Sequence, residues 1–129
     1  MHLEDRDLAY LVDMLSCCND IIEFTSEVTL EAFEHDRMRR LATERQLETL
    51  GEAAHHVSNS TQNSLVAIEW PKIVGLRNKL AHDYGEILAQ RVWQIAKRSI
   101  PELREHLLAV SEVRSKSGVG PDNRPNENI

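Results

Sequence analysis

Apolar residues recur every three or four positions along most of this chain, a spacing that is typical of amphipathic α-helices. Four such stripes cover roughly residues 5–25, 37–59, 71–84 and 87–113, and a brief helix is expected at 30–36. We therefore predict an all-α protein, an up-and-down bundle of four main helices plus this short helix.

Each stripe predicts which side chains enter the core. The predicted core positions are Leu8, Leu11, Leu15, Cys18, Ile22 and Thr25 in the first helix, Thr43, Leu47, Leu50, Ala54 and Val57 in the second, Ile73, Leu76, Leu80 and Ile87 in the third, and Val92, Ile95, Leu103, Leu107 and Val110 in the fourth. Gly51 and Ala54 are small, so a neighbouring helix can approach the second helix closely there. Pro71 suits a first helical turn, Gly85 can end the third helix, and Pro101 must start a new turn or kink the fourth.

Polar and breaker-rich segments set the expected boundaries. The segment 58–64 is polar and is predicted to be a loop. The segment 114–129 is rich in Gly, Pro and Asn and is predicted to be a disordered tail. A chain of 129 residues suits one core. We therefore expect one domain, residues 1–113, followed by the tail.

The net charge and the two cysteines limit the possible binding partners and cellular compartments of the protein. The net charge of −6 argues against a protein that coats nucleic acids non-specifically, although a local basic site remains compatible with it. Cys17 and Cys18 are adjacent, which suits neither a metal site nor a disulfide framework, and indicates a reduced, cytoplasmic setting. The start of the chain has no signal-peptide pattern, and no apolar run is long enough to cross a membrane.

The stretch RNKLAHDY, from Arg77 to Tyr84, departs from an ordinary helix face. On a helix Arg77 and Tyr84 nearly share one direction, close to the apolar stripe, where a fixed cation needs a partner or a cleft. His82 points roughly 140° away from Arg77 on an ideal helix. Either the helix loosens near Gly85, or a second copy of the chain supplies the other half of a shared site, as a two-fold dimer would.

These residue types suit phosphodiester chemistry. Arginine presents a fork of donors that matches phosphate oxygens, and it can stabilise the added negative charge of the transition state. Histidine titrates near neutral pH and can move protons. Because RNA carries its own 2′-hydroxyl nucleophile, an arginine and a histidine could cleave it without a metal ion.

The pattern of Arg77, His82 and Tyr84 resembles the signature of the HEPN superfamily. More narrowly, the chain resembles the HepT-like toxins of HepT–MntA toxin–antitoxin systems. The segments that carry the resemblance are RQLETLGEAAHHVS (45–58), WPKIVGLRNKLAHDYGEI (70–87) and VWQIAKRSIPELREHL (92–107). The resemblance covers roughly residues 5–110 and implies a HEPN-like helical fold that dimerises through the motif helix.

The resemblance also implies an activity and its regulation. It implies a metal-independent ribonuclease toxin, without cofactor, that cleaves messenger or transfer RNA in the cytoplasm. By position, Arg77 and His82 are the expected catalytic residues, and Asn78 supports them. Tyr84 is the expected acceptor of AMP from an MntA-like nucleotidyltransferase antitoxin, which binds the homodimer or forms a larger complex with it. The added bulk and negative phosphate would then block RNA.

Each motif residue also has a purely structural interpretation. Arg77 could bridge helices through an ion pair with a glutamate, and His82 could stabilise a last helical turn through the helix dipole. Tyr84 could be a core-edge residue with a solvated hydroxyl. Two other functions follow from these interpretations: a non-catalytic HEPN dimer that binds a nucleotide or a partner protein, and a plain helical dimerisation protein.

Other candidate motifs give weaker evidence for a functional site. Glu52 and His55 form a Glu-x-x-His pair, but di-iron bundles need a second such pair, so Glu52 is expected to pack or to support other groups. His55 and His56 lack further ligands at metal spacing. The basic run at 37–40 is expected to be a solvated face, with an RNA or partner contact as the alternative.

Overall fold

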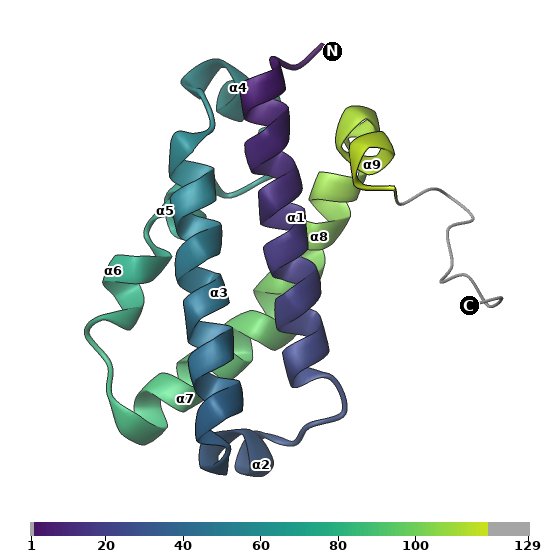
Figure 1. Cartoon of the computed structure of the whole chain (residues 1–129). Helices are drawn as coiled ribbons and strands as arrows, with labels where there is room; N and C mark the ends of the chain where they lie inside the picture. Colours follow the sequence, from purple (N-terminus) through teal and green to yellow (C-terminus); the bar gives the residue numbers. More distant parts are fainter. Residues whose placement is uncertain (1, 119–129) are drawn as a thin grey trace, which may run out of the picture.

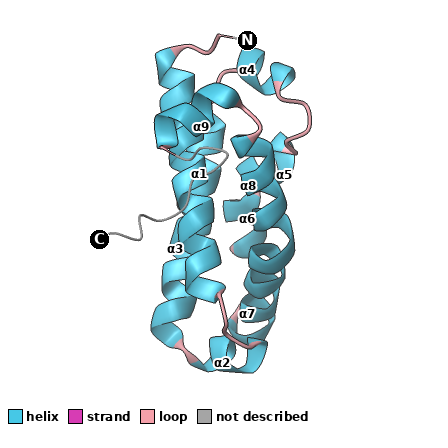
Figure 2. Ribbon diagram, turned by 90° about the vertical axis from the view of Figure 1, so that its right-hand side faces the viewer, coloured by secondary structure: helices cyan, strands magenta, loops and turns pink. Residues whose placement is uncertain are grey.

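A computed structural model describes residues 2–118, and over that range the chain forms helices and connecting segments without a strand (Figure 2). The helices are α1 (Asp5–Thr25), α2 (Leu30–His35), α3 (Arg37–His56), α4 (Asn59–Ser64), α5 (Trp70–Val74), α6 (Leu76–Leu80), α7 (Gly85–Gln94), the π-helical turn η1 (Ile95–Ser99), α8 (Ile100–Leu108) and α9 (Ser111–Ser117). The predicted all-α fold is confirmed.

Long helices run along the molecule and short ones fill its ends. Helices α1 and α3 lie side by side, and the path α7–η1–α8 crosses behind them (Figure 1). Helix α2 covers one end of the bundle, α4 lies at the other, and α5 and α6 run along the free side of α3 (Figure 1). The third predicted helix is therefore not one long rod but two short helices, α5 and α6.

The core lies where the first two stripes predicted it. Leu11, Leu15 and Cys18 of α1 are buried, while Leu8 and Ile22 are half-buried. The buried stripe of α3 is Thr43, Leu47, Leu50, Ala54 and, at its C-cap, Val57. Burying each such large apolar side chain contributes roughly 1.5–3 kcal/mol of transfer free energy, so packing of this stripe holds the two long helices together.

The close approach predicted at Gly51 is confirmed. A Cβ atom added there would lie 3.0 Å from the carbonyl oxygen of Ile73. Only a residue without a side chain therefore lets α5 lie this near to α3. The contact fixes the segment that leads into the RNKLAHDY stretch against one of the longest helices of the molecule.

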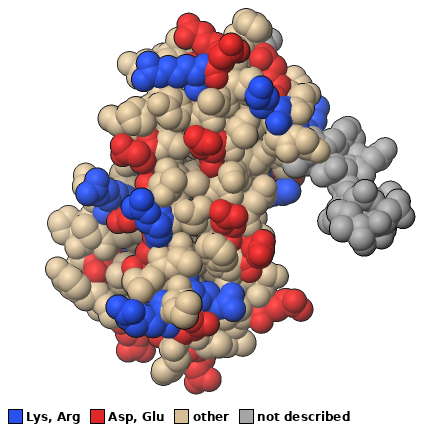
Figure 3. Space-filling model, viewed as in Figure 1, with Lys and Arg blue, Asp and Glu red and all other residues tan. Residues whose placement is uncertain are grey.

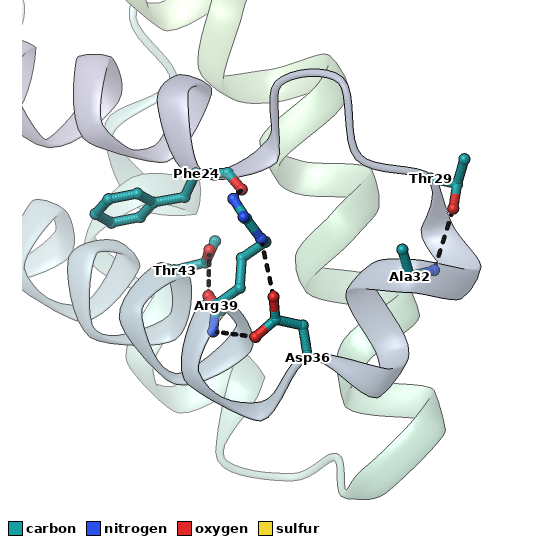
Figure 4. Close-up of polar contacts among 6 residues, drawn as sticks. All are labelled: Phe24, Thr29, Ala32, Asp36, Arg39 and Thr43. Atoms are coloured by element: carbon teal, nitrogen blue, oxygen red, sulfur yellow. Dashed lines mark hydrogen bonds and ion pairs between the residues drawn. The ribbon is translucent and has the colours of Figure 1, made fainter.

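The start of α3 is fixed by Asp36 and Arg39 (Figure 4). The Asp36 carboxylate accepts from the Arg39 backbone N–H at 3.0 Å and from Arg39 Nε at 3.2 Å. This backbone hydrogen bond is the largest effect that holds the pKa of Asp36 below its usual range. Arg39 Nη1 donates to the carbonyl oxygen of Phe24 at 2.5 Å, which ties α3 to the end of α1. One arginine of the basic run 37–40 is thus structural rather than a solvated charge.

The prediction of a loop at 58–64 is wrong, because Asn59–Ser64 form helix α4. The buried carboxylate of Asp7, far away on α1, organises it. Asp7 accepts from the Ser58 N–H at 2.9 Å, from Ser58 Oγ at 2.6 Å and from Thr61 Oγ1 at 2.5 Å. Burial alone raises the pKa of Asp7 and is the largest single effect, but these hydrogen bonds together outweigh it and leave the pKa below its ordinary value.

The last part of the fold follows one continuous path with an irregularity before Pro101. The predicted new turn or kink is confirmed, because the π-helical turn η1 ends at Ser99 and α8 begins at Ile100. Proline has no N–H to donate to the preceding turn, which accounts for the irregularity.

Helix α9 continues to Ser117, past the predicted end of the domain at 113, so residues 114–117 of the predicted disordered tail are helical. The rest of that tail, 119–129, lies outside the described residues. Among helices of residues 2–118, none combines the length and apolar character needed to cross a bilayer.

Candidate active site

The segment that carries the RNKLAHDY stretch is anchored by buried side chains on both sides of a break at Gly75. Trp70 is buried, and its indole N–H donates to the carbonyl oxygen of Leu65 at 3.1 Å. Ile73 lies in the core before the break, and Leu76 and Leu80 lie in it after the break. The predicted inward stripe is therefore confirmed up to Leu80, although the helix itself is interrupted.

Arg77 lies on the exposed side of α6 and lines a cleft of about 600 Å³ formed with α1 and α3. Within residues 2–118 its side chain makes no hydrogen bond or ion pair, so the structural interpretation, a bridge to a glutamate, does not apply. The carboxylates of Asp13, Glu48 and Glu52 line the same cleft beyond ion-pair distance of Arg77. Its guanidinium donors are thus available to an anionic ligand.

Cys17 also lines this cleft. Burial raises the pKa of its thiol to about 11, and that of the neighbouring Cys18 to about 12. Both thiols are free. Because the thiolate is the reactive form of cysteine, these raised pKa values disfavour either cysteine as a nucleophile near neutral pH.

His82 does not lie on the motif helix. Helix α6 ends at Leu80, and Ala81 and His82 form a turn, so the ideal-helix angle between Arg77 and His82 does not apply. The sequence left open whether the helix loosens near Gly85, and it ends even earlier. His82 is exposed, and no contact joins it to Arg77 within the described part of the chain.

Asp83 holds this turn, and the sequence analysis did not single it out. Its carboxylate forms an ion pair with Nε of Arg91 on α7, and the Asp83 side chain is only 16% exposed. The residues on both sides of it, His82 and Tyr84, are exposed. Anchoring Asp83 inward therefore directs both functional side chains outward. An acidic residue between two motif residues, followed by an arginine on the next helix, was the available signal.

Tyr84 precedes α7 in an extended conformation, and its side chain is 81% exposed. Gly85 has a φ of 56°, a left-handed conformation that favours glycine, and it begins α7 instead of ending a helix as predicted. Ile87, predicted to point into the core, is 61% exposed because α7 starts in a new direction. The core-edge interpretation of Tyr84 is therefore wrong.

Asn78 follows Arg77 on α6 and is exposed, with no side-chain hydrogen bond within residues 2–118. The structure thus presents Arg77, Asn78, His82 and Tyr84 on one stretch of 77–84, all solvent-accessible. No hydrogen bond or ion pair joins any two of these side chains within residues 2–118. Arg77 thus supplies a permanent positive charge and His82 an imidazole, and both side chains are accessible to a ligand.

His56, which lines the cleft of Arg77, has partners of its own. His56 stacks on Tyr10 with 5.2 Å between ring centroids, and its Nε2 lies 3.5 Å from Glu52. Glu52 therefore supports His56, in agreement with its expected supporting role. In the described range 2–118, no group of three or more His, Cys, Asp or Glu side chains lies close enough together to hold a metal ion. Figure 3 shows acidic and basic side chains interspersed over one face of the bundle.

Comparison with known proteins identifies the family of the chain. The sequence model of the family "Ribonuclease HepT-like" matches residues 14–110. The chain is 35% identical over 106 residues to "Putative RNase MJ1380" of Methanocaldococcus jannaschii, covering 81% of this chain and 97% of that protein. It is 33% identical over 95 residues to "Probable ribonuclease HepT" of Thermococcus cleftensis, covering 74% of this chain and 86% of that protein.

No solved structure matches the chain significantly. The chain belongs to the HepT-like ribonuclease family, which confirms the predicted family and the predicted enzyme class, a ribonuclease.

Proposed function

We propose that the protein cleaves phosphodiester bonds of cellular RNA without a metal ion, with Arg77 and His82 as the catalytic residues. The observation that carries this proposal is the exposure of both side chains, with no protein partner in the described chain: Arg77 lies on α6, and His82 lies on the turn that Asp83 and Arg91 hold in place. Charged and polar side chains that a fold fixes but does not pair are what a ligand site requires. Messenger and transfer RNA are the expected substrates.

The chemistry follows from the two groups. Arg77 binds the non-bridging phosphate oxygens and stabilises the charge that they gain. His82 takes the proton of the 2′-hydroxyl as its oxygen attacks phosphorus, and the bond from phosphorus to the 5′-oxygen breaks. A protonated histidine gives that leaving oxygen a proton. The products are a 2′,3′-cyclic phosphate and a 5′-hydroxyl end.

This reaction needs both a base and an acid, and each chain brings one histidine to the motif. Two copies related by a two-fold axis supply both, because the same surface of each copy meets the other. We therefore propose a homodimer in which the motif segments face each other. Its support is the exposure of Tyr84 at 81% and of Ile87 at 61%, together with Arg77, which has no partner within residues 2–118. Sedimentation equilibrium that finds only monomer at micromolar concentration would contradict the dimer.

The protein is further proposed to be a toxin that acts in the cytoplasm, with Tyr84 as the point of control. A nucleotidyltransferase antitoxin, bound to the dimer or joined with it in a larger complex, transfers AMP from ATP to the exposed Tyr84 hydroxyl and releases pyrophosphate. The attached phosphate then competes with RNA for the region around Arg77 by repulsion and bulk.

The decisive experiment compares wild-type protein with His82→Ala and with a control, His55→Ala, which changes an exposed histidine on α3. Intact mass first establishes that Tyr84 carries no adduct. Each protein is then incubated with total RNA in EDTA. We expect cleavage by the wild type and by His55→Ala, and a loss of about 10²–10⁴-fold in His82→Ala, the usual contribution of general acid–base catalysis. Cleavage that EDTA abolishes, or that His82→Ala retains, contradicts the mechanism.

A second candidate function is a dimer that binds a nucleotide or a partner without cutting RNA. The net charge of −6 favours it, as do the three carboxylates that line the cleft of Arg77. Absence of cleavage by wild-type protein with unmodified Tyr84 supports this function instead.

A further inference from the structure

A second cavity lies on the opposite side of α6 from the cleft of Arg77. Its volume is about 200 Å³, and it opens between the α5–α6 segment and the η1–α8 segment. Its apolar lining consists of core side chains, namely Leu50, Ile73, Leu76, Ile95, Ile100 and Leu103. A small apolar pocket with polar groups at its mouth is the usual form of a ligand site.

The mouth of this cavity carries unpaired positive charge. Lys72 and His106 have acidic neighbours, Glu69 at 3.0 Å and Glu102 at 3.7 Å respectively. Two further cations, Lys79 and Arg98, line the cavity, are exposed and have no ion pair within residues 2–118.

Lys79 and Arg98 therefore place two unneutralised cations beside an apolar pocket. They are complementary to a ligand that has an apolar planar part and a negative group.

Helix geometry connects this cavity to the catalytic residues. Successive residues of a helix are about 100° apart, so Arg77 and Lys79 diverge to the two sides of α6 with Asn78 between them. Arg77 accordingly lines the cleft beside α3, and Lys79 lines the second cavity. The outer face of α6 thus carries three consecutive polar side chains between the cleft and the second cavity, namely Arg77, Asn78 and Lys79.

We propose that the second cavity binds an unpaired base of the RNA substrate. The strand whose phosphate is held by Arg77 crosses the outer face of α6, a neighbouring phosphate contacts Lys79 and Arg98, and the base of that nucleotide enters the pocket. Arginine and imidazole planes such as those of Arg98 and His106 are surfaces on which unstacked bases pack. The inference rests on the proposed function and adds a requirement for single-stranded RNA, because a base inside a duplex cannot enter.

The test measures binding by the cleavage-deficient His82→Ala protein to a fluorescein-labelled single-stranded RNA oligonucleotide and to its duplex. Ser99 is exposed at the mouth of the cavity, so Ser99→Trp fills the pocket without changing the core, and Ser60→Trp on α4 is the matched control. We expect Ser99→Trp to weaken single-strand binding about tenfold, which is within the usual range for losing one stacked base. Duplex binding and the control are expected to be unchanged.

A charge variant tests the phosphate contact. Lys79→Gln should reduce the slope of log affinity against log salt concentration by about 0.7, the value for one phosphate contact on a single strand. Lys116→Gln, on the exposed side of α9, should leave the slope unchanged.

The outcomes separate the two proposals. Ser99→Trp is also made in the protein that keeps His82, and its circular dichroism is compared with that of the wild type. If this folded variant cleaves RNA at the wild-type rate and at the same positions, the base site alone is overturned. Equal losses for single strand and duplex also overturn it. Protein that neither binds nor cleaves any RNA overturns the proposed function together with the base site.

Discussion

Two helical segments of this protein each carry an arginine, and they use it in opposite ways. At the start of α3, Arg39 donates to the Asp36 carboxylate and to the carbonyl oxygen of Phe24, so its charge and donors are satisfied within the fold. On α6, Arg77 lines an open cleft and has no such partner in residues 2–118. The difference indicates that the first arginine contributes to stability and that the donors of the second are available to a ligand.

The largest expected effect tests that comparison directly, through Arg77→Ala and Arg39→Ala. Arg77→Ala should lower RNA cleavage by about 10²–10³-fold, the usual cost of removing one charge-stabilising donor. Its free energy of unfolding should stay within about 0.5 kcal/mol of the wild type, because no contact is lost. Arg39→Ala should lose roughly 1–3 kcal/mol of stability and keep its activity.

Urea unfolding and initial cleavage rates measure the two effects on the same preparations. Loss of stability in Arg77→Ala, with activity retained, would reverse the roles that the structure assigns to the two arginines.

The second largest expected effect concerns Asp83, whose carboxylate is held in an ion pair while the side chains of its neighbours, His82 and Tyr84, are exposed. Asp83→Asn removes the ion pair with Arg91 and keeps the shape of the side chain. We expect kcat to fall about 10- to 100-fold with little change in KM, since misplacing a catalytic group by about 1 Å costs up to 10² in rate. The measurement is steady-state cleavage of a short RNA.

Glu86→Gln, an exposed change on α7 beside the same turn, is the control and should leave kcat unchanged. Exchanging the charges, with Asp83→Arg and Arg91→Asp together, should restore part of the loss. An unchanged kcat in Asp83→Asn would mean that this ion pair does not position His82.

The smallest effect concerns pH and the other end of the bundle. Because the pKa of folded Asp7 lies below its ordinary value, its charged form stabilises the fold, and that contribution is present above the unfolded pKa near 3.8. It should be lost as pH falls from about 5 through the folded pKa. Glu44 acts in the opposite direction, because burial raises its pKa.

Thr61→Val isolates the contribution of Asp7, since it removes one hydrogen bond to Asp7 and leaves Asp36 and Glu44 untouched. We expect the variant to lose less stability than the wild type between pH 5 and pH 3. Thermal unfolding across that range measures it. Equal slopes for the two proteins would show that the hydrogen bond from Thr61 does not contribute to the lowered pKa of Asp7.

Much of the fold was predictable because its causes are local. The spacing of Leu11 and Leu15 in α1 and of Leu47 and Leu50 in α3 reports burial directly, since a helical period places them on one face. Helix α4 was missed because its polar sequence carries no such stripe. What stabilises it is Asp7, far away along the chain, and no local pattern can report a partner of that kind.

The residues of the candidate site could be named from the sequence, but the geometry that surrounds them could not. The apolar stripe continues in sequence from Ile73 through Ile87, which favours one helix, yet the chain ends α6 at Leu80 and restarts α7 at Gly85. Tertiary packing decided this, because Leu80 is anchored in the core while Asp83 pairs with Arg91. The catalytic roles of Arg77 and His82 remain predictions.

The link between α6 and α7 carries a consequence for how this protein can evolve. Connections between helices usually tolerate insertions and deletions. Here an added or deleted residue between Leu80 and Gly85 would move Asp83 away from Arg91, or turn His82 or Tyr84 inward. We therefore expect substitutions at positions such as Ala81 to be tolerated, and insertions or deletions between Leu80 and Gly85 not to be. The length of this segment should vary less during evolution than its composition.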